Sequence, residues 1–237
     1  VGGNSSTGTI RSLEIQSSGA LRFVGYGADW VVTGVTLAVG QLYHLAVSWN
    51  GDDIVVYVNG NGYSQTLASL TTPTGTKFKI GEEVWSTGDD ANIKCISASF
   101  YTATLSLSEI QSIYNNGHQV SEVGNSNIAH YWKMDNGSTV TDLVGSKNLT
   151  VTGATLNTGN NGIVAGTPDA ITIREGLNSN KDGLGFPLTN PTSNIVRFSR
   201  NGLAEHLSIP ITKAFDIQGS FTVEFWIRLD ALGESRI

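Results

Sequence analysis

The chain has 237 residues and a formal net charge of −6, and 39% of its residues are hydrophobic. This length suits one large β-sandwich or two small domains. A mildly acidic chain with 14 Lys and Arg residues argues against a nucleic-acid partner or an anionic membrane surface. The sequence has no apolar run of about 18 residues, so we expect no membrane-spanning helix.

Short segments with alternating apolar residues recur along the chain and predict β-strands. The first two, Ser12–Gln16 and Ala20–Gly25, are joined by a Ser-Ser-Gly turn. The others are Trp30–Leu37, Leu42–Trp49, Ile54–Gly60, Tyr63–Ser69, Lys77–Glu82, Ile93–Leu105, Ala129–Asp135, Asn148–Gly153, Ala170–Glu175, Asn194–Ser199, His206–Pro210 and Phe221–Leu229. Many short strands separated by turn signals indicate a sandwich or jelly roll. The single cysteine, Cys95, lies in one of these strands and is predicted to be a small buried hydrophobe.

One segment, Ser106–Gly117, has the pattern of a short helix. We expect Ser108 to cap its N-terminus and Gly117 to end it, while Ile110 and Ile113 lie on one face. The longest stretch without a predicted element is Gly176–Thr192. Loops of this length are usually functional or disordered.

Four blocks of the sequence resemble laminin G-like and pentraxin-like domains of the concanavalin A-like class. Tyr43–Gly60 resembles the central hairpin of that family, and Phe78–Gly117 resembles its closing part. Ile128–Gly153 looks like the family's first strand and turn, and His206–Leu232 looks like the strands that enter its core. The resemblance implies an all-β, concanavalin A-like jelly roll: a two-sheet antiparallel β-sandwich with one short helix.

The resemblance runs in swapped order along the chain. Residues 1–118 resemble the second half of one domain, residues 127–237 resemble its first half, and residues 118–127 link them. Two explanations compete. The chain is either one circularly permuted jelly roll or a window cut from tandem repeats. We favour permutation, because the halves are complementary and a fragment would expose long unpaired edges; Val1 and Ile237 are then expected within about 10–15 Å of each other.

Two segments also look like parts of tailed-phage and marine-virus virion proteins. These are the block Ala165–Asn190 and the junction Asn115–Asp135. This resemblance implies a virion fibre, decoration or tail-associated protein, located in the virion or outside the cell. The expected partners are other virion proteins, further copies of this chain and a surface glycan.

Candidate ligand residues gather in predicted loops. Trp85 lies in a Gly-bounded loop and Trp30 follows Gly-Tyr-Gly-Ala-Asp, and loop aromatics can stack on sugar rings. Asp89, Asp90 and Asn92 share the Trp85 loop and complete the predicted carbohydrate site. The alternative for both tryptophans is packing against the edge of the sandwich. Trp49, Trp132 and Trp226 lie within strands and are predicted to pack in the core.

The same loop is a candidate calcium site. Calcium often lies at the sandwich rim in the resembled family, and carboxylates are suitable ligands for it. The predicted metal ligands are Glu82, Asp89 and Asp90. The alternative is a solvated acidic loop, which the absence of EF-hand spacing favours.

Catalysis is not expected from the sequence. Glycan-hydrolysing relatives of this fold class carry alternating carboxylates on one strand, whereas Glu224 stands alone among aromatic neighbours. The sequence is compatible with three functions. The first is a non-catalytic virion or surface module for assembly and glycan adhesion, the second is a calcium-dependent secreted lectin, and the third is a polysaccharide-degrading enzyme. Paired acids on one concave face would favour the third.

Overall fold

The computed structural model describes residues 8–71, 77–82, 91–115, 122–157, 195–198, 206–210, 219–232 and 235–236. Its strands are β1 (Ser12–Ile15), β2 (Ala20–Val24), β3 (Trp30–Thr36), β4 (Leu42–Asn50), β5 (Asp53–Val58), β6 (Asn61–Thr66), β7 (Lys77–Ile80), β8 (Ile93–Tyr101), β9 (Ile128–Lys133), β10 (Thr139–Val140), β11 (Leu149–Thr152), β12 (Thr155–Asn157), β13 (Ile195–Arg197), β14 (His206–Pro210), β15 (Phe221–Leu229) and β16 (Ser235–Arg236). The predicted strand Ala170–Glu175 and the loop Gly176–Thr192 lie outside the described residues.

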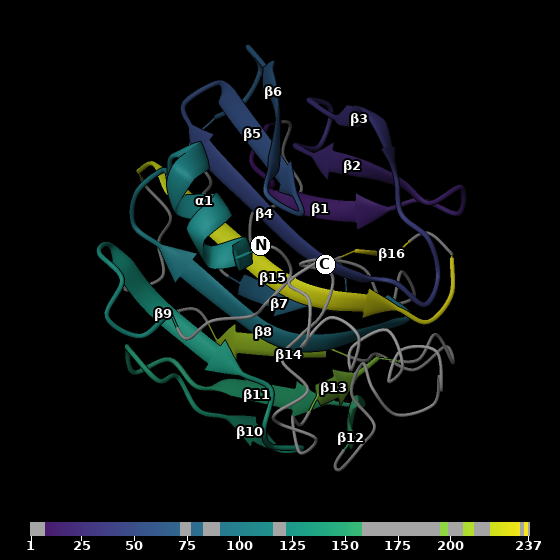
Figure 1. The fold of residues 1–237 in the computed structure, drawn as a ribbon, viewed down its shortest axis with the longest axis vertical. Helices are drawn as coiled ribbons and strands as arrows, with labels where there is room; N and C mark the ends of the chain where they lie inside the picture. The colour runs from purple at the N-terminus through teal and green to yellow at the C-terminus, as the bar shows by residue number, and fades with distance from the viewer. Residues whose placement is uncertain are drawn as a thin grey trace, which may run out of the picture.

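The strands form one large and two small antiparallel sheets (Figure 1). The large sheet has the order β12-β13-β8-β15-β4-β5-β6, and β9 also pairs with β8. The small sheets have the orders β16-β1-β2-β3 and β10-β11-β14-β7. One apolar core joins all three, with Phe23, Phe225 and Leu207 among its members. The chain therefore folds as a concanavalin A-like β-sandwich, as the sequence predicts.

Strands from both ends of the chain are interleaved in this sandwich. β15 lies between β4 and β8, so that Trp226 is paired with His44 on one side and with Ser97 on the other. β16 pairs with β1, with Arg236 opposite Glu14. Val1 and Ile237 lie outside the described residues, so the predicted distance between them stays a prediction.

Helix α1 (Leu107–Tyr114) covers the face of the large sheet that points away from the main core (Figure 1). Ile110 and Ile113 are buried against Tyr101 of β8 and Tyr57 of β5. These contacts confirm the expected apolar face of the helix.

The predicted ends of α1 are wrong. The N-cap is Ser106 and not Ser108, because Ser106 and Glu109 form a capping box in which each side chain bonds the other residue's backbone N–H. The C-cap is Asn115, whose left-handed backbone ends the helix before Gly117.

No helix in the described part of the chain is long and apolar enough to cross a membrane.

Candidate functional site

A buried polar cluster lies between the large sheet and the segment that follows α1. Alternation along the strands places Leu45 and Phe225 in the main core, so His44 of β4 and Glu224 of β15 face the α1 side. His44 Nε2 lies 2.8 Å from Glu224 Oε2, and both side chains are fully buried. Glu224 is the one acid on β15, as the sequence indicates, but the tertiary structure gives it partners from other elements.

A second buried acid, Glu122, meets Glu224 at a shared serine. Ser99 Oγ of β8 lies 2.5 Å from Glu122 Oε2 and also within hydrogen-bonding distance of Glu224 Oε1. A serine hydroxyl carries one hydrogen, so it can donate to one of these carboxyls and must accept from the other. One of the two glutamates is therefore protonated in this geometry.

The environment of the cluster favours uncharged acids. Burial raises the pKa of Glu224 to about 7. Burial, and next the charge of Glu224, raise the pKa of Glu122 well above its usual value. Burial also lowers the pKa of His44 to about 4. A buried group of two carboxyls and one imidazole is electrically neutral when it holds two protons, and these directions agree with that state.

Glu122 and Glu224 lie close together, but both are buried away from solvent. Glu122 and Glu224 each have 0% of their surface exposed, whereas glycoside hydrolysis requires two carboxyls on either side of an accessible sugar bond. Tyr101 donates to Glu122 Oε2 at 2.5 Å, and Asn125 Nδ2 donates to the Tyr101 hydroxyl at 3.3 Å. The cluster therefore ties residues 122–125 to the sheet.

Above this cluster the surface is hollowed beside α1. The hollow has a volume of about 280 Å³, and we call it the α1 groove. The described residues that line it are Tyr101, Leu105, Ser108, Glu109, Ser112, Ile113, Asn125 and Ser126. A second hollow on the other side of the helix shares Ser108 and Ser112 and is also lined by Asn59, Gly60, Asn61, Gln111 and Tyr114.

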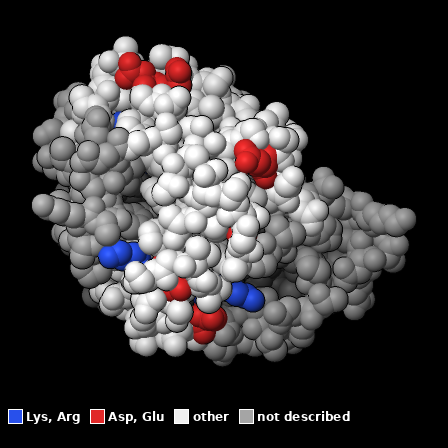
Figure 2. All heavy atoms as spheres, turned by 90° about the vertical axis from the view of Figure 1, so that its left-hand side faces the viewer, with Lys and Arg blue, Asp and Glu red and all other residues white. Residues whose placement is uncertain are grey.

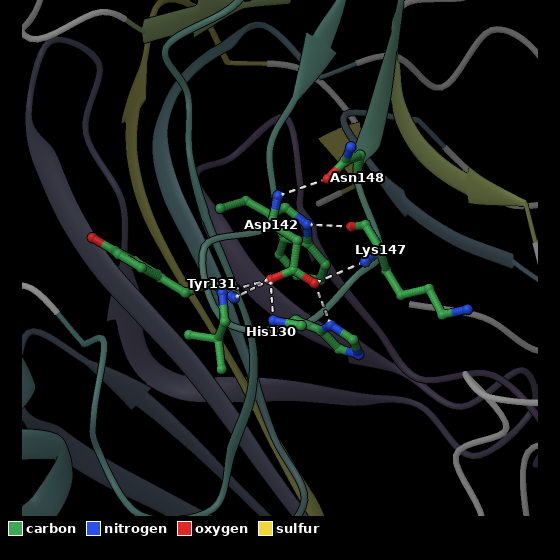
Figure 3. Close-up of polar contacts among 8 residues, drawn as sticks. His130, Tyr131, Asp142, Lys147 and Asn148 are labelled. Atoms are coloured by element: carbon green, nitrogen blue, oxygen red, sulfur yellow. Dashed lines mark hydrogen bonds and ion pairs between the residues drawn. The ribbon is translucent and has the colours of Figure 1, made fainter.

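Asp142 is the centre of a further polar network (Figure 3). Its Oδ2 lies 2.6 Å from His130 Nδ1 and accepts the N–H of Lys147 at 2.9 Å, while its Oδ1 accepts the N–H groups of Tyr131 and Gly145. Burial opposes ionisation, but the bonds from His130 and from the backbone of Lys147, Gly145 and Tyr131 lower the pKa of Asp142 to about 2. Because its oxygens are all engaged, this carboxylate holds the turn after β9 together.

The structure describes two of the five residues predicted to bind carbohydrate, Trp30 and Asn92. Trp30 begins β3, is half-buried and packs against the main core. The carbonyl of Asn92, just before β8, accepts from Asp230 N at the end of β15. Trp85, Asp89 and Asp90 lie outside the described residues.

Of the predicted metal ligands, the structure describes Glu82. It is 2% exposed, and its Oε2 lies 2.6 Å from both Lys79 Nζ and His206 Nδ1. Its charge is therefore already compensated by protein groups. Among the described residues no group of three His, Cys, Asp or Glu side chains could hold a metal ion, and the calcium site stays a prediction.

The tryptophans predicted to be in the core are confirmed: Trp49, Trp132 and Trp226 are 4%, 0% and 1% exposed. The polar cluster was missed by sequence reasoning. The alternation of apolar residues along β4 and β15 could have placed His44 and Glu224 on the same face of the large sheet. Glu122 lies in a segment without a periodic pattern, so its place in the cluster could not be predicted in this way.

The fold is that of a concanavalin A-like β-sandwich, and one comparison with known families agrees with it. Residues 1–111 match the model of the concanavalin A-like lectin/glucanases superfamily. No curated protein and no solved structure matches the chain. The matched residues include β1 to β8 and the first half of α1.

Proposed function

We propose that the chain is a non-catalytic adhesion module that binds carbohydrate. The observation that carries this proposal is the match of residues 1–111 to a superfamily of lectins and glucanases. A fold alone does not decide between binding and hydrolysis, so the choice rests on the site.

The buried acids support binding over hydrolysis. Glu122 and Glu224 are the acids that the described structure brings together, and neither is exposed. A substrate would have to displace residues 122–125, which Glu122 and Tyr101 hold to the sheet. The contacts of Ser99 and His44 give both acids a structural role.

The test is a glycan array probed with the purified chain, followed by analysis of the retained glycans for cleavage. Binding without cleavage is the expected result. Trp85→Ala and Trp30→Ala then test the rim tryptophans as sugar-stacking residues, with circular dichroism as the control for folding. Release of shorter sugars would instead favour the polysaccharide-degrading enzyme.

For its setting, we propose a virion or another extracellular surface, with copies of this chain or other virion proteins as partners. This proposal is supported by the resemblance of Ala165–Asn190 and Asn115–Asp135 to virion proteins. Light scattering of the purified chain is expected to show a homo-oligomer. Calcium dependence is a separate outcome: loss of glycan binding on addition of EDTA would favour the secreted, calcium-dependent lectin.

A further inference from the structure

We propose that the α1 groove is a saccharide-binding site, with room for one sugar unit in the groove and a second unit on the other side of the helix. This inference rests on the proposed function and gives it a location that differs from the predicted rim site at Trp30 and Trp85. It is carried by the way the groove is built and by the chemistry of its lining.

Both walls of the groove are fixed by polar contacts beneath the surface. The capping box of Ser106 and Glu109 holds the start of α1. On the other side, Glu122 and Tyr101 fix the backbone that carries Asn125. A site whose walls are held in place before binding loses less conformational entropy when a ligand arrives.

The lining of the groove suits a sugar. Ser108, Ser112 and Ser126 place hydroxyl groups around it, and Asn125 adds an amide. Leu105 and Ile113 supply an apolar floor. A sugar ring presents hydroxyl groups at its edge and C–H groups on its faces, so it matches a site with a few polar groups around an apolar surface.

The size of the groove limits the ligand. Its volume of about 280 Å³ is at the small end of the range for ligand pockets, about 300–1,000 Å³. One sugar ring fits this volume better than an extended chain does. The second hollow shares Ser108 and Ser112 with the groove and adds the Tyr114 ring and the Gln111 amide. A disaccharide or trisaccharide that crosses the helix would contact both hollows.

The charge near the groove selects against acidic sugars. Glu109 is the one charged side chain among the described residues that line it. Figure 2 shows the side of the molecule that is on the left in Figure 1, and charged side chains are sparse among its described residues. A carboxylate on the ligand would be repelled by Glu109, so we expect a neutral oligosaccharide and not a uronic or sialic acid.

The experiment is calorimetric titration with neutral trisaccharides of glucose, mannose and N-acetylglucosamine, chosen from those that the array retains. Ser126→Trp places a large side chain in the groove from an exposed position, and a loss of affinity of more than ten-fold is expected. Ser112→Ala removes one hydroxyl, for which about a five-fold loss is expected. Ser146→Ala, an exposed serine on the Asp142 turn, is the matched control and should bind as the wild type does.

The outcomes separate the two proposals. If the wild type binds a glycan and both groove variants bind it equally well, the groove assignment is overturned and the adhesion function stands. Loss of binding in Trp85→Ala alone would then place the site at the rim. If the wild type retains no glycan on the array, the adhesion function and the groove are both overturned.

Discussion

At the residue scale, the chemistry of the molecule centres on Ser99. Its hydroxyl lies between Glu122 and Glu224, and its one hydrogen requires a proton on one of the acids. The neutral cluster holds two protons, whereas the same groups in an unfolded chain hold fewer as the pH rises above 4.5. When the folded state binds protons that the unfolded chain does not bind, the free energy of unfolding depends on pH.

The first prediction is the sign of that dependence. Glu224, with its pKa raised from 4.5 to about 7, stabilises the fold below pH 4.5, and this contribution is lost as the pH rises through 7. Glu122 acts in the same direction. The pKa of His44 is lowered from 6.5 to about 4, so its contribution has the opposite sign. That contribution to stability is present above pH 6.5 and is lost as the pH falls from 6.5 to 4. Stability should therefore peak near pH 4.5 and fall as the pH rises from 5 to 8.

Urea unfolding at a series of pH values measures this change. Glu122→Gln keeps the shape of the side chain and removes one titrating group, so it should reduce the loss of stability between pH 5 and 8. Asp52→Asn, at an exposed position, is the control and should leave the slope unchanged. A stability that rises from pH 5 to 8 would contradict the protonated cluster.

A second prediction concerns Asp142. Asp142→Asn loses the carboxylate oxygen that receives Lys147 N–H and His130, and the expected cost is about 2 kcal/mol in the free energy of unfolding. Asp135→Asn changes an exposed carboxylate on the same segment and should cost little. Because the pKa of Asp142 is lowered from 3.8 to about 2, its stabilisation is lost as the pH falls through that interval. Equal melting temperatures of the two variants would show that the network around Asp142 contributes nothing to stability.

At the element scale, α1 shows how closely a sequence can define a helix. Its apolar face follows from the spacing of Ile110 and Ile113, but two serines compete for the N-cap. Ser106 and Glu109 have the Ser-x-x-Glu spacing of a capping box. This spacing is visible in the sequence and identifies Ser106 as the N-cap, whereas the sequence prediction placed the cap at Ser108.

The third prediction separates these two serines. Ser106→Ala removes the side chain that accepts from Glu109 N–H and should destabilise the chain by about 1 kcal/mol. Ser108→Ala is the matched control, because Ser108 lies within the helix and is exposed, and it should change stability by a few tenths of a kcal/mol at most. Thermal unfolding of both variants provides the comparison, and a larger loss in Ser108→Ala would contradict the cap.

The strands were predictable from alternation because each has one face in the core. Residues 42–49 were predicted as a strand, and β4 spans Leu42–Asn50. The polar cluster could not be predicted in the same way. Glu122 and Glu224 are 102 positions apart, and Glu122 lies in an irregular segment, so no local pattern connects them. The hollow beside α1 likewise depends on how that segment packs against the sheet.

At the scale of the whole molecule, the order of the strands supports a circular permutation. β15, near the end of the chain, lies between β4 and β8. β16 and β1 are antiparallel neighbours. If Val1 followed Ile237, these two strands would be consecutive in the chain, as in a hairpin. We propose that the chain is a permuted single domain, in preference to a window cut from tandem repeats.

The fourth prediction tests this topology. A rearranged chain, in which residues 119–237 come first and are joined to residues 1–118, should fold to the same secondary structure as the original. Circular dichroism and a cooperative urea transition would show this, and size-exclusion chromatography would show whether it is monomeric. A rearranged chain that folds only on mixing with a second copy would favour the tandem-repeat explanation.

The central claim is that the molecule binds glycans and leaves them intact. One array experiment tests it most directly: the purified chain is applied to neutral oligosaccharides, and the retained sugars are then analysed by mass spectrometry. The account predicts retention of at least one oligosaccharide with its length unchanged, because Glu122 and Glu224 are buried away from any ligand. Retention of none, or the appearance of shorter products, would contradict it.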